Sequence, residues 1–148
     1  MISQKGIDLI CKFEGLSLKA YPDPGTGNSP WTIGYGHTKG VKPEDVCTKE
    51  QAVEWLKEDI AIAENQLNKV LYVQLNQNQR DALLSFVFNL GIGSLQKSTL
   101  LKYLNLGKFN EAANEFLKWT KANGKELPGL VKRRAAESSL FKEPYEIS

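Results

Sequence analysis

Apolar residues recur every three or four positions through most of the chain, which is the pattern of amphipathic helices. The clearest run covers residues 49–69, with apolar side chains at Ala52, Leu56, Ile60, Ala63 and Leu67. Thr48 and Gln51 stand at the spacing of a capping box just before it. We therefore predict one long amphipathic helix there, with its acidic residues on a solvated face: Glu50, Glu54, Glu58, Asp59 and Glu64.

The same periodicity predicts five shorter helices, over residues 4–13, 77–90, 96–105, 111–120 and 130–141. Ser3, Asn76 and Asn110 are the expected N-caps, because their side-chain oxygens can accept from the first free backbone N–H groups. Gly91, Gly93 and Gly107 are the expected stops. The segment 77–90 is the most apolar of the chain and is expected to be the central core helix. Residues 122–129 are expected to be a loop.

Residues 16–38 follow a different pattern, with glycines and prolines interleaved among aromatic and β-branched residues. This composition predicts short antiparallel strands joined by tight turns. A small β region attached to a helical body predicts an α+β fold. Such an irregular segment is also where functional side chains are often mounted on a rigid scaffold.

Two carboxylates flank this β region. Glu14 is expected at the end of the first helix, where the helix dipole and the neighbouring Phe13 and Leu16 favour the protonated acid. Asp23 lies between two prolines, in a turn that should be solvated and leave it ionised. Carboxyl groups in such contrasting environments can serve as an acid and a base or nucleophile, as glycoside hydrolysis requires. The alternative is that Glu14 is a surface residue at a helix end and Asp23 an ordinary turn former.

The stretch FEGLSLKAYPDPGTGNSPWTIGYGHT (residues 13–38) resembles the catalytic segment of the phage-type lysozymes, glycoside hydrolase family 24. Residues 77–105 and 127–141 also read like segments of that family, so the resemblance covers nearly the whole chain. It implies a lysozyme-like α+β fold, with a small N-terminal β lobe and a C-terminal helical lobe joined by a long helix. The expected bounds within one domain, 1–148, are about 14–47 for the β lobe, 49–69 for the connecting helix, and 70–148 plus 4–13 for the helical lobe.

The resemblance implies hydrolysis of the β-1,4 bond between N-acetylmuramic acid and N-acetylglucosamine in peptidoglycan, with inversion, for lysis of a bacterial host. Glu14 would be the general acid, and Asp23 with Thr32 would position the attacking water. A lytic transglycosylase and a non-catalytic peptidoglycan-binding module remain alternatives.

The spacing of the site threonine departs from the family pattern, because Thr32 lies nine residues after Asp23 rather than about six. We interpret this as a short insertion between Gly25 and Pro30. Thr32 is preferred because a strand residue has a fixed direction. Thr26, in the glycine-rich loop, is the alternative.

The resemblance also suggests substrate contacts at Phe88, Asn89 and Ser98. The aromatic rings of Trp31, Tyr21 and Tyr35 could line a sugar groove, with Tyr35 as a predicted substrate contact, or could simply pack against the strands. His37, the only histidine, is expected to be structural.

The composition adds mainly exclusions. The 148 residues carry a net charge of +2, which suits an anionic polymer only weakly. Cys11 and Cys47 form no zinc or CxxC pattern and are expected to be reduced, so no metal or cofactor is predicted. We expect a monomer that binds peptidoglycan, without nucleic acid or stable membrane insertion. The sequence begins with no signal-peptide pattern, so we expect it in the host cytoplasm until the membrane opens, and then at the cell wall.

Overall fold

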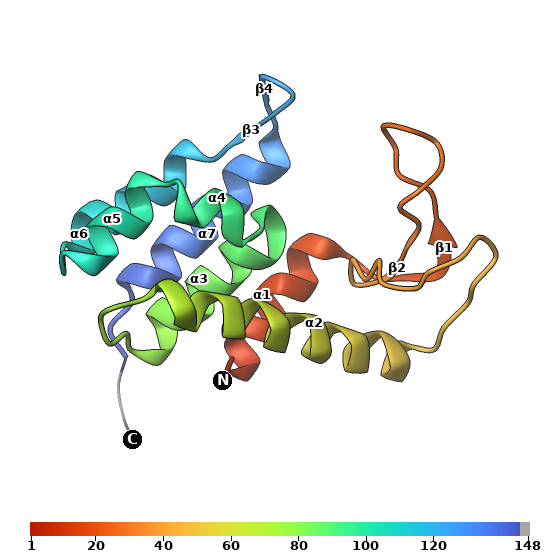
Figure 1. The fold of residues 1–148 in the computed structure, drawn as a ribbon, viewed down its shortest axis with the longest axis horizontal. Coiled ribbons are helices and arrows are strands. Elements are labelled where there is room, and N and C mark those ends of the chain that lie inside the picture. The colour runs from red at the N-terminus through yellow and green to blue at the C-terminus, as the bar shows by residue number, and fades with distance from the viewer. Residues whose placement is uncertain (146–148) are drawn as a thin grey trace. The chain divides into compact units, whose positions relative to one another are not determined.

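The computed structural model describes residues 1–145 and has an α+β fold, as predicted (Figure 1). Its strands are β1 (Ser17–Tyr21), β2 (Thr32–Gly34), β3 (Lys121–Ala122) and β4 (Lys125–Glu126). A short 3-10 helix covers Phe116–Lys118, and the α-helices are α1 (Gln4–Glu14), α2 (Lys49–Val70), α3 (Gln77–Leu90), α4 (Ile92–Gln96), α5 (Thr99–Asn105), α6 (Phe109–Glu115) and α7 (Pro128–Lys142).

The chain divides into two compact units. We call residues 10–62 the hairpin unit, because it contains the β1–β2 hairpin. We call residues 1–9 with 63–148 the helical unit. Helices α1 and α2 each contribute residues to both units.

The predicted N-cap of α2 and the predicted capping box of α3 are confirmed. At the start of α2 the backbone N–H of Gln51 donates to the Thr48 hydroxyl at 3.1 Å. At the start of α3, Gln79 N–H donates to Asn76 Oδ1 at 2.8 Å while Asn76 N–H donates to Gln79 Oε1 at 3.0 Å, a complete capping box. Gly91 ends α3 with φ +86°, a conformation that glycine adopts without steric strain.

The core of the helical unit is built around α3, which lies beside α7 (Figure 1). Phe86 is completely buried and meets Phe116 and Trp119 edge to face, with ring centroids 5.6 and 5.5 Å apart. Charged side chains are buried beside these rings, and the Arg134 guanidinium lies 5.1 Å from the centroid of the Phe86 ring. Glu137 lies 3.0 Å from Arg134 Nε and accepts from the Ser85 hydroxyl at 2.5 Å. The prediction of α3 as the central core helix is therefore confirmed.

The hairpin unit has less regular structure. Strands β1 and β2 are antiparallel, with Ser17 opposite Gly34 and Tyr21 opposite Thr32. Residues 45–47 extend this hairpin, because Ala20 N–H donates to Asp45 O and Cys47 N–H donates to Leu18 O, both at 2.9 Å.

Gly34 is needed where β2 meets α2. Its φ is +66°, and an added Cβ would lie 3.1 Å from Ala52 Cβ. Any side chain at this position would be both strained and crowded, so the glycine lets the strand pack closely on the helix.

The predicted helix over 96–105 is wrong in its bounds. Two helices, α4 and α5, replace it, and Gly93 lies inside α4 rather than ending α3. The break falls at Ser98, whose hydroxyl accepts from Leu101 N–H at 3.0 Å as the N-cap of α5. A serine that bonds local backbone competes with helix continuation, which explains the interruption.

The predicted cap at Asn110 is also wrong. Helix α6 begins at Phe109 with Lys108 as its N-cap, and the helix ends at Glu115 rather than near residue 120. Gly107, at φ +74°, turns the chain early enough for Lys108 O to accept the first helical bond from Ala112.

Residues 121–126 form a hairpin, although we predicted a loop. Lys121 pairs with Glu126 and Ala122 with Lys125. The turn is Asn123-Gly124, with φ values of +51° and +78°. An Asn-Gly pair is the preferred two-residue hairpin turn, so the sequence carried a signal for this element.

Among the helices of residues 1–145, none combines the length and apolar character needed to cross a bilayer.

Candidate active site

Glu14 is the last residue of α1 and is half-buried. The helix ends there because Gly15 adopts φ +73° and its N–H donates back to Cys11 O at 3.0 Å. This left-handed cap turns the chain out of the helix directly after the carboxylate. The predicted position of Glu14 at the helix end is confirmed.

Asp23 is held by the backbone of its own turn. Its Oδ2 accepts from Gly25 N–H at 3.0 Å and from Thr26 N–H at 3.1 Å. Its own N–H donates to Asn28 O at 2.9 Å, and its carbonyl accepts from Gly27 at 2.7 Å. Four bonds thus fix the turn, and two of them orient the carboxylate without a side-chain cation.

Thr32 and Thr26 lie in different environments. Thr32 is the first residue of β2 and pairs with Tyr21, two residues before Asp23. Its hydroxyl has no hydrogen-bond partner among residues 1–145. The hydroxyl of Thr26 donates to Ser29 O at 3.0 Å and accepts from Asn28 N–H at 3.2 Å, so it is committed to the loop.

All three residues predicted as catalytic lie in the hairpin unit. Glu14 is at the end of α1, Asp23 is in the turn after β1, and Thr32 is at the start of β2. A different local feature sets each backbone position: the Gly15 cap for Glu14, the hydrogen-bonded turn for Asp23, and the strand pairing with Tyr21 for Thr32. Two carboxyl groups and a hydroxyl can together transfer a proton and orient a water molecule.

Tyr35, predicted to contact substrate, is 8% exposed and belongs to the core of the hairpin unit. Burial, with a smaller contribution from the Cys11 side chain that bonds its hydroxyl, raises the pKa of Tyr35. Little of this ring is accessible to a sugar. Cys11 and Cys47 are separate thiols rather than a disulfide, and burial raises the pKa of Cys47.

His37 is part of a cluster that the sequence did not predict. Its Nδ1 lies 2.8 Å from Asp59 Oδ2, and its ring stacks on Trp55 at 4.8 Å between centroids. His37 and Ile33 also exchange backbone hydrogen bonds at 2.9 Å. Placing Asp59 among the solvated acids was therefore wrong, since it binds the buried histidine and ties β2 to α2.

Phe88, Asn89 and Ser98 belong to the helical unit. Phe88 and Asn89 are half-buried in the last turn of α3, and Asn89 Oδ1 accepts from Arg134 at 2.6 Å. This bond fixes the amide and leaves its NH₂ as a donor. Ser98 is 8% exposed and its hydroxyl donates to Leu95 O at 2.6 Å, so its observed contacts are those of a helix cap.

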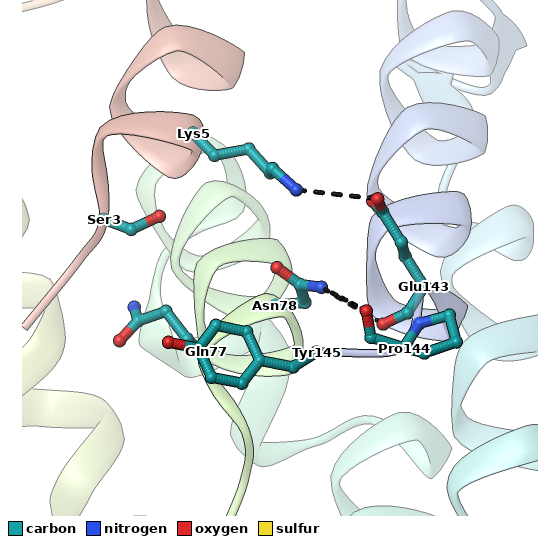
Figure 2. Close-up of a pocket in the computed structure, with 7 residues that line it drawn as sticks. All are labelled: Ser3, Lys5, Gln77, Asn78, Glu143, Pro144 and Tyr145. Atoms are coloured by element: carbon teal, nitrogen blue, oxygen red, sulfur yellow. Dashed lines mark hydrogen bonds and ion pairs between the residues drawn. The ribbon is translucent and has the colours of Figure 1, made fainter. Parts of the chain in front are cut away.

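Figure 2 shows a pocket of about 530 Å³ in the helical unit, lined by residues of α1, α3 and the chain after α7. Lys5 Nζ lies 3.5 Å from Glu143 Oε1, and Asn78 donates to Glu143 O at 3.1 Å. These bonds hold the end of the described chain to the helices. The predicted catalytic residues do not line this pocket.

Within residues 1–145, no three His, Cys, Asp or Glu side chains lie where they could together hold a metal ion.

The α+β fold of this chain, mostly helical with small antiparallel sheets, is lysozyme-like. The chain matches the phage lysozyme family over residues 11–137, and it belongs to that family. It is accordingly a muramidase-type hydrolase of peptidoglycan, and the predicted lysozyme-like fold is confirmed.

Three similar proteins illustrate the relationship. An endolysin from Acyrthosiphon pisum secondary endosymbiont phage 1 is 51% identical over 144 residues, covering 95% of this chain and 97% of that one. An endolysin from Bacillus phage B103 is 50% identical, but this chain spans only 53% of its length. The muramidase domain of SpmX from Asticaccaulis excentricus has a TM-score of 0.90 at 40% identity, with 97% of this chain and 99% of that one covered.

Proposed function

We propose that this enzyme hydrolyses the β-1,4 bond between N-acetylmuramic acid and N-acetylglucosamine, with Glu14, Asp23 and Thr32 as its catalytic residues. Glu14 protonates the glycosidic oxygen as the bond to the leaving sugar breaks. Glu14 is the last residue of α1, so its side chain extends from a defined helix end directly before the Gly15 turn.

Asp23 stabilises positive charge on the sugar and, with Thr32, orients the attacking water. The two backbone N–H groups on Oδ2 keep this carboxylate in a single orientation. Its second oxygen can then face the sugar and the water. The Thr32 hydroxyl can bind the same water, because no described residue occupies it. Water entering opposite the leaving group inverts the anomeric carbon, which calls for carboxyl groups roughly 6.5–9.5 Å apart.

The observation that best supports this proposal is the hairpin itself. The Tyr21–Thr32 pair places the start of β2 beside the end of β1, from which the chain enters the Asp23 turn. The pairing of β1 with β2 therefore relates the Asp23 turn to the position of Thr32. The chain that carries this hairpin belongs to the phage lysozyme family.

The decisive experiment analyses the products that the enzyme releases from purified peptidoglycan. The wild-type enzyme should release reducing ends, with each product carrying one added water by mass. Proton NMR during the first minutes should show the α-anomer, since the β-linked substrate is inverted. Asp23→Asn should remove most of this activity.

Two results would contradict the proposal. Products lacking the added water would indicate an anhydro sugar and a lytic transglycosylase. Binding to the polymer with no reducing ends would indicate a non-catalytic binding module. An initial β-anomer would refute inversion alone and would point to a covalent intermediate on Asp23.

We further propose that the enzyme lyses a bacterial host from within, as an endolysin that reaches the wall after the inner membrane opens. Its acid pair needs no cofactor, so access to the wall would control the activity. Turbidity of outer-membrane-stripped cells should fall when wild-type protein is added.

A further inference from the structure

The hairpin unit contains a second concavity, which we call the Trp31 pocket. It has a volume of about 530 Å³ and is lined chiefly by Lys19, Trp31, Pro43, Glu44, Asp45 and Val46. This volume is in the range of small-ligand sites. Glu14, Asp23 and Thr32 are not among its lining residues.

One wall of the Trp31 pocket is a fixed aromatic ring. The indole Nε1–H of Trp31 donates to Asn28 Oδ1 at 3.3 Å, which restrains the ring from its polar edge. Trp31 directly precedes Thr32, the first residue of β2, and Thr32 does not line the pocket.

The segment 43–46 also lines the pocket, and hydrogen bonds hold it in place. Ala20 N–H donates to Asp45 O at 2.9 Å, and Asp45 Oδ2 accepts from Lys42 N–H at 2.8 Å. Between these anchors Glu44 adopts φ +73°, which is strained for a residue with a side chain. Glu44 is exposed, and its carboxylate has no hydrogen-bond or ion-pair partner among the described residues.

The chemistry of the Trp31 pocket indicates its ligand. An indole face beside Pro43 and Val46 suits the C–H face of a pyranose ring. The carboxylates of Glu44 and Asp45 can accept from sugar hydroxyls and outnumber the single cation, Lys19. Such a rim disfavours a strongly anionic ligand and suits a neutral sugar.

We propose that the Trp31 pocket binds an N-acetylglucosamine unit of the glycan at a second site, apart from the bond being cleaved. The proposal rests on the proposed function for its ligand. A second contact on a polymer makes rebinding intramolecular, so that the enzyme remains on the wall between cleavages.

The first test measures binding without turnover. The Glu14→Gln protein, labelled with ¹⁵N, is titrated with the β-1,4-linked tetramer of N-acetylglucosamine, and the Trp31 indole N–H signal is assigned with Trp31→Phe. The Trp31 signal should shift saturably, while the Trp119 signal stays constant. No shift at millimolar sugar would overturn the proposal.

A matched pair of variants separates this pocket from other sugar contacts. Glu44→Gln should weaken the Trp31 titration about 3- to 10-fold by removing a charged acceptor. Glu58→Gln removes an exposed acid of α2 from the same unit and should have no effect. Equal titration curves for both variants would exclude Glu44 and the proposed ligand geometry.

The second test uses intact sacculi and the active enzyme. Trp31→Ala should raise KM for sacculi about 3- to 10-fold with kcat within twofold, and Trp31→Phe should restore most of the loss. Circular dichroism checks that both variants fold. A fall in kcat alone would assign Trp31 to support of Thr32 and overturn the second site.

The two proposals fail in different ways. If wild-type protein releases no reducing ends, the proposed function fails, although the Trp31 titration can still succeed. If hydrolysis is normal and the Trp31 signal does not respond, only the second site fails.

Discussion

The hairpin unit and the helical unit are stabilised by different means. In the hairpin unit, Asp23 and its turn depend on backbone hydrogen bonds between nearby residues, and most side chains of residues 21–32 are exposed. In the helical unit, side chains far apart in the sequence are fully buried, such as Phe86 against Phe116. Even the ionic group there, Arg134 with Glu137, is 0% exposed.

The residues proposed for catalysis and the residues that stabilise the fold are therefore held by different interactions. A catalytic carboxylate needs access to substrate, so burial cannot hold it in place. Local hydrogen bonds and glycine turns supply the orientation instead, at little cost in accessibility. The free energy that keeps the chain folded comes mainly from apolar burial. Substitutions of the proposed catalytic residues should therefore lower activity, whereas substitutions in the core of the helical unit should lower the free energy of unfolding.

The largest expected effect is on catalysis, from Glu14→Gln. Loss of a general acid should reduce turnover by about 100-fold or more. The urea midpoint should change little, since the new side chain has the same shape and Glu14 is only half-buried. Reducing-end release and urea denaturation, measured on the same preparation, check both parts. Lysis at the wild-type rate would remove Glu14 from the mechanism.

Phe86→Ala is the counterpart in the helical unit. Removing a ring with 0% exposure should cost about 3–5 kcal/mol of unfolding free energy, because it loses burial and leaves a cavity between Phe116 and Trp119. Chemical denaturation followed by tryptophan fluorescence measures the loss. At a temperature where the variant remains folded, kcat should stay within a few-fold of wild type. A stable variant with no activity would break the proposed separation.

The two threonines sharpen the comparison within the hairpin. Thr32→Ala should reduce kcat by about 10-fold or more, because the water loses a positioning group. Thr26→Ala removes two loop hydrogen bonds and should lower stability by roughly 1 kcal/mol, with a smaller effect on kcat. Parallel assays decide between them, and full activity in both variants would mean that neither belongs to the site.

The smallest effect is expected at a helix cap. Asn76→Ala breaks the capping box of α3 and should lower the unfolding free energy by about 1 kcal/mol, whereas Asn76→Ser should keep most of it. The urea midpoints of both variants, with kcat as the control, test this. A large loss of activity in Asn76→Ala would show that α3 affects the site more directly than its cap implies.

Local rules predicted much of this structure. The caps at Thr48 and Asn76 and the end of α1 at Glu14 follow from spacing and from turn chemistry between neighbouring residues. The hairpin at Asn123-Gly124 could have been predicted in the same way, since its turn type requires those residues. Ser98 was harder, because serine inside a helical pattern can either tolerate or interrupt it.

The sequence alone was enough to predict the helical pattern, the glycine-rich hairpin, Glu14 at the end of the first helix and Asp23 in the hairpin turn, because each depends on interactions over a few residues. The tertiary structure alone decided that Asp59 binds His37, that Tyr35 is buried, and that Glu137 joins Ser85 and Arg134 inside the core. These pairings join residues far apart in the chain or depend on which face an element buries. Hydrophobic periodicity identifies such a face but does not specify its partner.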